Sequence, residues 1–288
     1  WIQASFESLD PLPYRLLSLI VYICILPLLY HLYNLILENK TLSKIAVLLF
    51  TSFYLNNQSV TLIVNLKELL LVLFSLAALV CFIHYKKTRS PRYYALALLL
   101  AILATSSKET AIFILPPLLL AVDYYISHGI FPPRVPSLKE VRRSLLPHLP
   151  FWLIALVPII FIFMRSGHPY TPYIEPGQPV PVSKYLWNIY WFIIYSFSPC
   201  FAVTSRPTLI LALSIIAGLG WLFYRSTPQR RALIITLMTC TGLSFFPYIL
   251  VGVVPRYMTF PATFSMLLVS LLALEIGFFL HRFLEKRF

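Results

Sequence analysis

A short polar segment that carries both members of a charge pair is the part of this sequence best suited to chemistry. Residues 106–110 read Ser-Ser-Lys-Glu-Thr and lie between two apolar runs, at residues 93–105 and 111–126. Both runs predict membrane-buried helices, so the segment must lie at a membrane surface, because a Lys near the bilayer centre costs roughly 2.5–3.5 kcal/mol. Charges held this close to hydrocarbon are candidates for function, and Lys108 and Glu109 are the first two.

Two further turns place cations beside apolar runs in the same way. Lys67 lies next to Glu68 at the start of one run, and Arg256 lies next to Tyr257 in the short turn between the last two runs. We expect Lys67, Lys108 and Arg256 to converge on a cavity for an anionic headgroup with an apolar tail, such as a polyprenyl phosphate or another phospholipid. The alternative is that each Lys–Glu pair only neutralises itself or extends to the interface.

The composition requires that membrane helices position these groups. Of the 288 residues, 59% are hydrophobic and 11% are charged, and the mean hydropathy is +0.81, which excludes an ordinary soluble domain. The apolar runs are continuous and do not alternate with period two, so they predict helices and not a barrel. We expect an all-α, polytopic transmembrane bundle that forms a single domain over residues 1–288.

The sequence indicates neither a cofactor nor a nucleic-acid partner. The four cysteines are scattered through apolar runs without metal-type spacing, so no disulfide framework and no zinc site is expected, while a need for a divalent metal stays open. The net charge is +13, but the cations cluster in short loops between apolar runs. That pattern follows the positive-inside rule and is not typical of a phosphate-binding face for nucleic acid.

Run lengths and loop charges predict the topology. We expect about nine spans, with residues 185–203, interrupted by Ser198-Pro199, as one re-entrant or interfacial helix; a crossing needs about 20 residues. The basic loops and the C-terminus then lie in the cytoplasm, and the N-terminus and the candidate site face the other side of a bacterial inner membrane or an ER-type membrane. The cations on that other side are Arg15, Lys67, Lys108, Arg165, Lys184, Arg206 and Arg256.

Four short stretches resemble the motifs of one family of membrane enzymes. Residues 105–111, followed by Leu115-Pro116 and Asp123-Tyr124, resemble the S-[ST]-K-E-x-A…LP…D segment of GT-C superfamily glycosyltransferases, in the protein O-mannosyltransferase-like and TPR-linked O-mannosyltransferase branch. The other three stretches resemble the P-x-x-[FY]-H, G-R-x-E-L-L and R-Y-L-x-x-P motifs of that branch, in the same order. They are residues 11–15, 65–70 and 256–261.

The resemblance implies an inverting transferase with a GT-C-like fold. Such an enzyme moves a sugar from a polyprenyl phosphate to an acceptor hydroxyl, on a protein or a glycan, at the extracytoplasmic side. An acidic residue in the first external loop acts as general base, and cations stabilise the phosphate leaving group. By position, the implied ligands of the lipid phosphate are Lys108 and Arg256, followed by Tyr257 and Lys67, with Glu109 beside them.

The sequence departs from the family pattern where catalysis is expected. The acidic loop would precede Trp1, so no catalytic residue is assigned, and Glu7 and Asp10 lie too close to the first span to replace it. Residues 56–60 replace a His-Pro and a Glu, and Pro255 stands where many relatives have Glu. Two interpretations stay open. The chain is a transferase or a fragment of one, or it is a non-catalytic scaffold, a pseudoenzyme that binds lipid among the subunits of a larger membrane complex.

Overall fold

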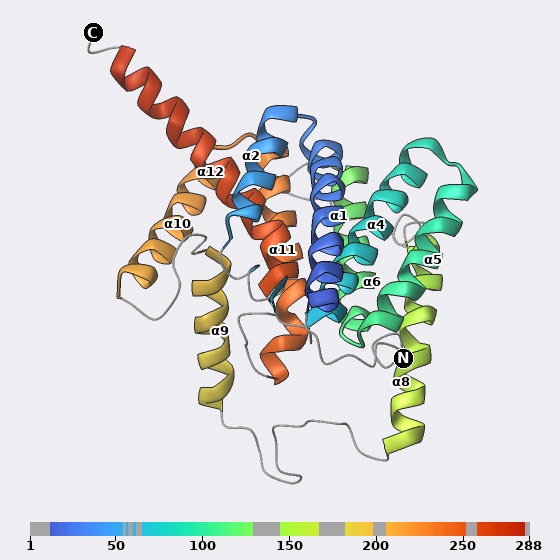
Figure 1. Ribbon diagram of the computed structural model, residues 1–288. Coiled ribbons are helices and arrows are strands. Elements are labelled where there is room, and N and C mark those ends of the chain that lie inside the picture. The colour runs from blue at the N-terminus through green and yellow to red at the C-terminus, as the bar shows by residue number, and fades with distance from the viewer. Residues whose placement is uncertain are drawn as a thin grey trace.

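The chain folds into a bundle of α-helices (Figure 1). The computed structural model describes residues 12–53, 56, 60–61, 65–128, 145–166, 182–197, 206–251 and 258–285. Within these residues the helices are α1 (Leu12–Leu37), α2 (Lys40–Thr51), α4 (Leu66–Thr88), α5 (Pro91–Ser107), α6 (Ala111–His128), α8 (Leu149–Ser166, preceded by the 3-10 turn η3, Leu146–His148), α9 (Val182–Phe197), α10 (Arg206–Arg225), α11 (Pro228–Val251) and α12 (Thr259–Glu285). The described part contains no strand, which confirms the all-α prediction.

Three of these helices, α1, α4 and α12, are long and apolar enough to cross a bilayer. They have 26, 23 and 27 residues, compared with the about 20 residues that a crossing needs. Shorter apolar stretches occur in α6, α8 and α10. The protein is therefore an integral membrane protein, whereas the count of about nine spans stays a prediction.

The apolar runs at residues 93–105, 111–126 and 185–203 overlap α5, α6 and α9. The run at residues 185–203 corresponds to α9, which ends at Phe197, and Ser198-Pro199 lies outside the described residues. A re-entrant path for this segment therefore stays a prediction.

Local sequence sets the turns that bring neighbouring helices together. Asn39 caps α2, because its side-chain oxygen accepts a hydrogen bond from the N–H of Leu42 at 3.0 Å. Arg89 ends α4 in the left-handed region, with φ 58°, and its N–H donates to the carbonyl of Tyr85 at 2.7 Å. Pro91 then begins α5, where a missing N–H costs nothing. These tight turns place α1 beside α2 and α4 beside α5.

Two helices organise the packing. α4 packs against α1, α5 and α6, and α12 packs against α2, α9, α10 and α11. α1 joins the two groups, since the buried Tyr33 hydroxyl donates a hydrogen bond to the backbone carbonyl of Thr263 in α12. The first half of α12 is buried from Thr259 to Leu272. Its second half extends beyond the other helices (Figure 1).

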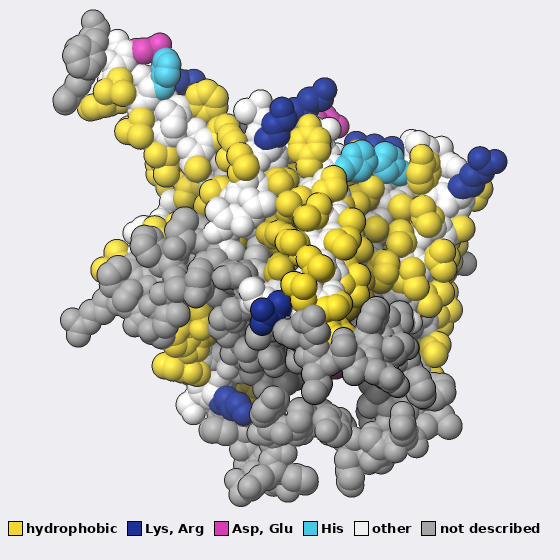
Figure 2. Space-filling model, viewed as in Figure 1, with side chains coloured by type: hydrophobic (Ala, Val, Ile, Leu, Met, Phe, Trp, Pro, Cys, Tyr) yellow, Lys and Arg dark blue, Asp and Glu magenta, His cyan; other side chains and the backbone are white. Residues whose placement is uncertain are grey.

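Charged side chains gather towards the two ends of the bundle. Lys87 Nζ of α4 lies 3.8 Å from Glu38 Oε1 in the α1–α2 turn. Arg230 Nη1 of α11 lies 2.8 Å from Glu275 Oε2 of α12. Figure 2 shows Lys and Arg side chains along the upper edge of one face and hydrophobic side chains across its middle. The end with the turns at residues 38–39, 89–90 and 226–227 is named the basic end. The opposite end contains the start of α4 and the α5–α6 turn.

A buried cluster around Asp123 connects three elements near the basic end. The Asp123 carboxylate of α6 is fully buried, accepts a hydrogen bond from Lys86 Nζ at 2.8 Å and lies 2.9 Å from His148 Nε2. Ser127 Oγ donates to the same carboxylate at 3.2 Å. The His148 ring packs against Phe82, with ring centroids 5.0 Å apart. One carboxylate thus connects α4, α6 and η3.

We predict that Asp123→Ala lowers the free energy of unfolding by about 3–5 kcal/mol, because the variant leaves the buried His148 and the partly buried Lys86 without their carboxylate. Ser127→Ala is the matched control. It removes one hydrogen bond to the same carboxylate and costs about 1 kcal/mol. Chemical unfolding of both purified variants in detergent measures the difference, and equal losses would show that the carboxylate does not hold the cluster together.

Candidate functional site

The charged segment between α5 and α6 forms a tight turn at the opposite end of the bundle. Lys108 follows the last residue of α5 in an extended conformation, with φ −158° and ψ 135°, and its N–H donates to the carbonyl of Ala104 at 3.2 Å. The carbonyls of Lys108 and Glu109 accept hydrogen bonds from the N–H groups of Ala111 and Ile112, each at 3.1 Å. The turn therefore satisfies the first backbone donors of α6 while it reverses the chain.

The Lys108 side chain points into the bundle and meets a carboxylate from α4. Lys108 Nζ forms an ion pair with Oε1 of Glu68 and donates a hydrogen bond to it. The Lys108 side chain is 6% exposed and that of Glu68 is 4% exposed. Because both charges are removed from water, each depends on the other for compensation.

A tyrosine from α11 completes this site. The Tyr248 hydroxyl donates to Glu68 Oε2 at 3.4 Å, and Lys108 Nζ lies 5.1 Å from the centroid of the tyrosine ring, within the range of a cation–π contact. Tyr248 packs against Phe245 at 6.1 Å, and Phe245 stacks on Phe192 of α9 at 3.9 Å. Lys108, Glu68 and Tyr248 are named the Lys108 cluster. It joins the α5–α6 turn to α4 and α11.

The sequence neighbours of the pair are arranged differently from the pair itself. Lys67 and Glu109 are exposed, and within the described part of the chain neither forms an ion pair. The charges of Lys108 and Glu68 are therefore compensated between helices, not between adjacent residues. Arg256 and Tyr257 lie outside the described residues, so the convergence of all three turns stays a prediction.

The Lys108 cluster and the Asp123 cluster lie towards opposite ends of α4. Glu68 is in the first turn of this helix and Lys86 is in its last turn. Their separation along the helix corresponds to about 27 Å at 1.5 Å per residue, which is close to the about 30 Å thickness of the hydrocarbon core. The Lys108 cluster is thus one bilayer thickness away from the basic end.

Two members of the cluster were not predicted as site residues from the sequence. Glu68 was considered only as the neighbour of Lys67, and Tyr248 lies in an apolar run with no distinguishing pattern. The available signal for Glu68 was a carboxylate in the first turn of an apolar span, since such a group must find a partner. That signal does not say which cation the partner is.

We predict that Lys108→Met and Glu68→Leu each lower the free energy of unfolding by about 3–5 kcal/mol, because each removes one partner of a buried ion pair. The double variant should be less destabilised than either single variant, since it removes both charges. Lys67→Met, at the exposed neighbour, should change stability by no more than about 0.5 kcal/mol. Unfolding of the two single variants and the double variant in detergent completes the double-mutant cycle. Additive losses of stability in the double variant would contradict the coupling of Lys108 to Glu68.

Comparison with known proteins assigns the family. The family described as dolichyl-phosphate-mannose-protein mannosyltransferase matches residues 1–164, more than half of the chain, and the match includes Glu68 and Lys108. No curated protein and no solved structure matches the chain significantly. The family match confirms the resemblance to GT-C-like mannosyltransferases that the motifs indicate. The chain belongs to the dolichyl-phosphate-mannose-protein mannosyltransferase family of membrane glycosyltransferases.

Proposed function

We propose that this membrane glycosyltransferase takes a mannosyl group from a polyprenyl phosphate and transfers it to a hydroxyl of an acceptor protein at the extracytoplasmic surface. The observation that carries the proposal is the Lys108–Glu68 pair. Two segments with family-like motifs, residues 65–70 and 105–111, meet there at one end of the bundle. The family assignment supports the type of reaction.

The distribution of charge supports an extracytoplasmic site. Lys and Arg side chains gather at the basic end (Figure 2), and the positive-inside rule assigns such loops to the cytoplasm. The Lys108 cluster lies at the other end of α4. In this orientation α1 begins outside and α12 ends in the cytoplasm.

The lipid phosphate would be bound by several cations with different roles. Glu68 is a positioning residue, because it holds Lys108 Nζ in one place and nearly cancels its charge. The net positive charge then comes from the exposed Lys67 and from Arg256, which precedes α12. Tyr257 and Glu109 would lie at the edge of the same site.

The proposed reaction is a displacement at the anomeric carbon of the sugar. The acceptor oxygen forms a bond to C1 while the bond from C1 to the phosphate oxygen breaks, and the polyprenyl phosphate leaves with the electron pair. A carboxylate base accepts the hydroxyl proton, and the bound cations stabilise the negative charge that develops on the phosphate. Attack from the face opposite the leaving group inverts C1. We assign no residue of this chain as the base.

The compensation of the Lys108 charge favours one alternative function. A buried ion pair can fix the positions of helices without contacting any ligand. The chain would then be a non-catalytic GT-C-like scaffold subunit that binds anionic lipid and holds partner subunits in a membrane complex. This alternative predicts lipid binding without sugar transfer.

We predict that Arg256→Ala and Lys67→Ala each weaken the binding of polyprenyl phosphate about tenfold, because each variant removes a charge-assisted contact. Lys108→Ala should weaken binding by at least as much, because it leaves the negative charge of Glu68 beside the phosphate. Arg92→Ala removes an exposed cation at the basic end and is the matched control with unchanged affinity. Titration of each purified variant in detergent with polyprenyl phosphate measures the dissociation constants.

Unchanged affinity in both Lys108→Ala and Arg256→Ala would remove the lipid-phosphate site. The wild-type protein, incubated with polyprenyl-phosphate mannose and a peptide that contains Ser and Thr, separates the two functions. Formation of mannosylated peptide supports the transferase. Binding of the donor without transfer supports the scaffold.

A further inference from the structure

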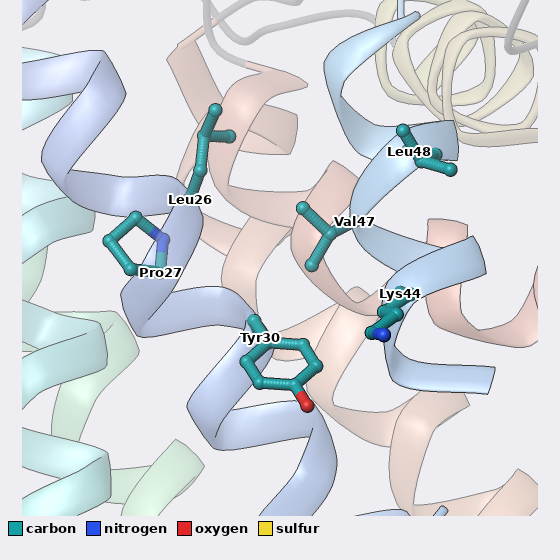
Figure 3. A pocket seen from close by; sticks show the side chains of 6 residues that line it. All are labelled: Leu26, Pro27, Tyr30, Lys44, Val47 and Leu48. Carbon is teal, nitrogen blue, oxygen red and sulfur yellow. The ribbon is translucent and has the colours of Figure 1, made fainter. Parts of the chain in front are cut away.

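A groove between α1 and α2 lies near the basic end, away from the Lys108 cluster. Its volume is about 490 Å³, and it is lined by Leu26, Pro27, Tyr30, Lys44, Val47 and Leu48. Figure 3 shows Tyr30 and Lys44 at one end of the groove and Leu26 and Leu48 at the other. The groove therefore has one polar end and is otherwise apolar.

The two helices close the groove from behind and leave its front open. The lining residues recur at spacings of three and four along each helix, so they form one face of α1 and one face of α2. On the core side, Leu29 of α1 and Ala46 of α2 are fully buried. On the open side, Leu48 is 67% exposed. Because α1 is long and apolar enough to cross a bilayer, we expect this open side to face the lipid.

Pro27 adds to the depth of the groove. It lies inside α1 and has no N–H, so it cannot donate the usual helix hydrogen bond. Its ring is exposed and short compared with the leucines around it. An acyl chain can follow such an apolar channel without leaving the hydrocarbon.

The polar end of the groove carries a positive charge near the basic end of the bundle, where we expect the lipid headgroups. Lys44 is one helical turn from the start of α2, is exposed, and forms no ion pair within the described residues. The phenol of Tyr30 lies beside it (Figure 3). An ammonium group and a hydroxyl next to an apolar channel are complementary to a phosphate that carries an acyl chain.

We propose that this groove binds one anionic glycerophospholipid from the leaflet at the basic end. The phosphate contacts Lys44 and the Tyr30 hydroxyl, and one acyl chain lies along Leu26, Pro27 and Val47. The proposal is independent of the sugar-transfer reaction, because the groove and the Lys108 cluster are at different ends of the bundle. A bound lipid here connects α1 to α2 on their open side.

The test is native mass spectrometry of the purified chain, titrated with phosphatidylglycerol or phosphatidylcholine of identical acyl chains. We expect one phosphatidylglycerol to bind more tightly than phosphatidylcholine. Lys44→Ala should weaken the binding of phosphatidylglycerol about fivefold and leave the binding of phosphatidylcholine unchanged. Val47→Trp should fill the channel and prevent the binding of that one phosphatidylglycerol molecule. Lys40→Ala removes a cation from the same helix that does not line the groove, and it should bind as the wild type does.

Four results would overturn the proposal. The first is equal affinity of the wild type for the two lipids. The second is an equal loss of affinity in Lys44→Ala and Lys40→Ala, which would indicate attraction by the surface charge as a whole. The third is unchanged binding of phosphatidylglycerol to Val47→Trp, when this variant unfolds at the same temperature as the wild type. Tighter binding of polyprenyl phosphate than of phosphatidylglycerol, lost in Lys44→Ala, would also reject a glycerophospholipid as the occupant.

Discussion

Burial of charge in a membrane bundle is the constraint on which the arrangement of these helices depends. In the described part of the chain, Lys108 is paired with Glu68 and Asp123 with Lys86, and the half-buried Glu275 with Arg230. Each pair joins residues of different helices or turns. Hydrocarbon does not solvate an ion, so separation of Lys108 from Glu68, or of Asp123 from its partners, costs several kcal/mol. Apolar contacts between helices lack this directional requirement, and the ion pairs therefore specify which helices meet.

α4 is the helix through which this constraint acts at both surfaces. Glu68 in its first turn holds the α5–α6 turn and α11, and Lys86 in its last turn holds α6 and η3. Displacement of α4 by one residue would turn its side chains by about 100° and separate both charges from their partners. The register of α4 thus fixes the position of the proposed phosphate site and that of the structural cluster at the basic end together.

Local properties of the sequence were sufficient to predict the helices but not their pairing. Hydropathy belongs to each run by itself, so the order of the helices and the all-α class followed from it. The pairing of Lys108 with Glu68 depends on a contact across 40 residues. Adjacent residues on a helix, such as Lys67 and Glu68, point in directions about 100° apart, and for this reason only Glu68 faces the core. Glu275 lies in an apolar helix and also needs a partner, yet only the packing of α11 on α12 identifies that partner as Arg230.

The different environments of Lys44 and Lys108 have consequences for which lipids each can attract. An exposed ammonium such as that of Lys44 attracts any anionic headgroup, and phospholipids of the surrounding leaflet are in large excess. Lys108 is buried and paired with Glu68, and its ammonium is therefore not presented to bulk phospholipid. A ligand of the proposed phosphate site must therefore supply further contacts to offset the cost of entering it, and that requirement would be a source of specificity. Under this proposal, pairing of Lys108 with Glu68 reduces competition from bulk phospholipid and favours a ligand with a recognisable headgroup, as the proposed sugar-bearing polyprenyl phosphate has.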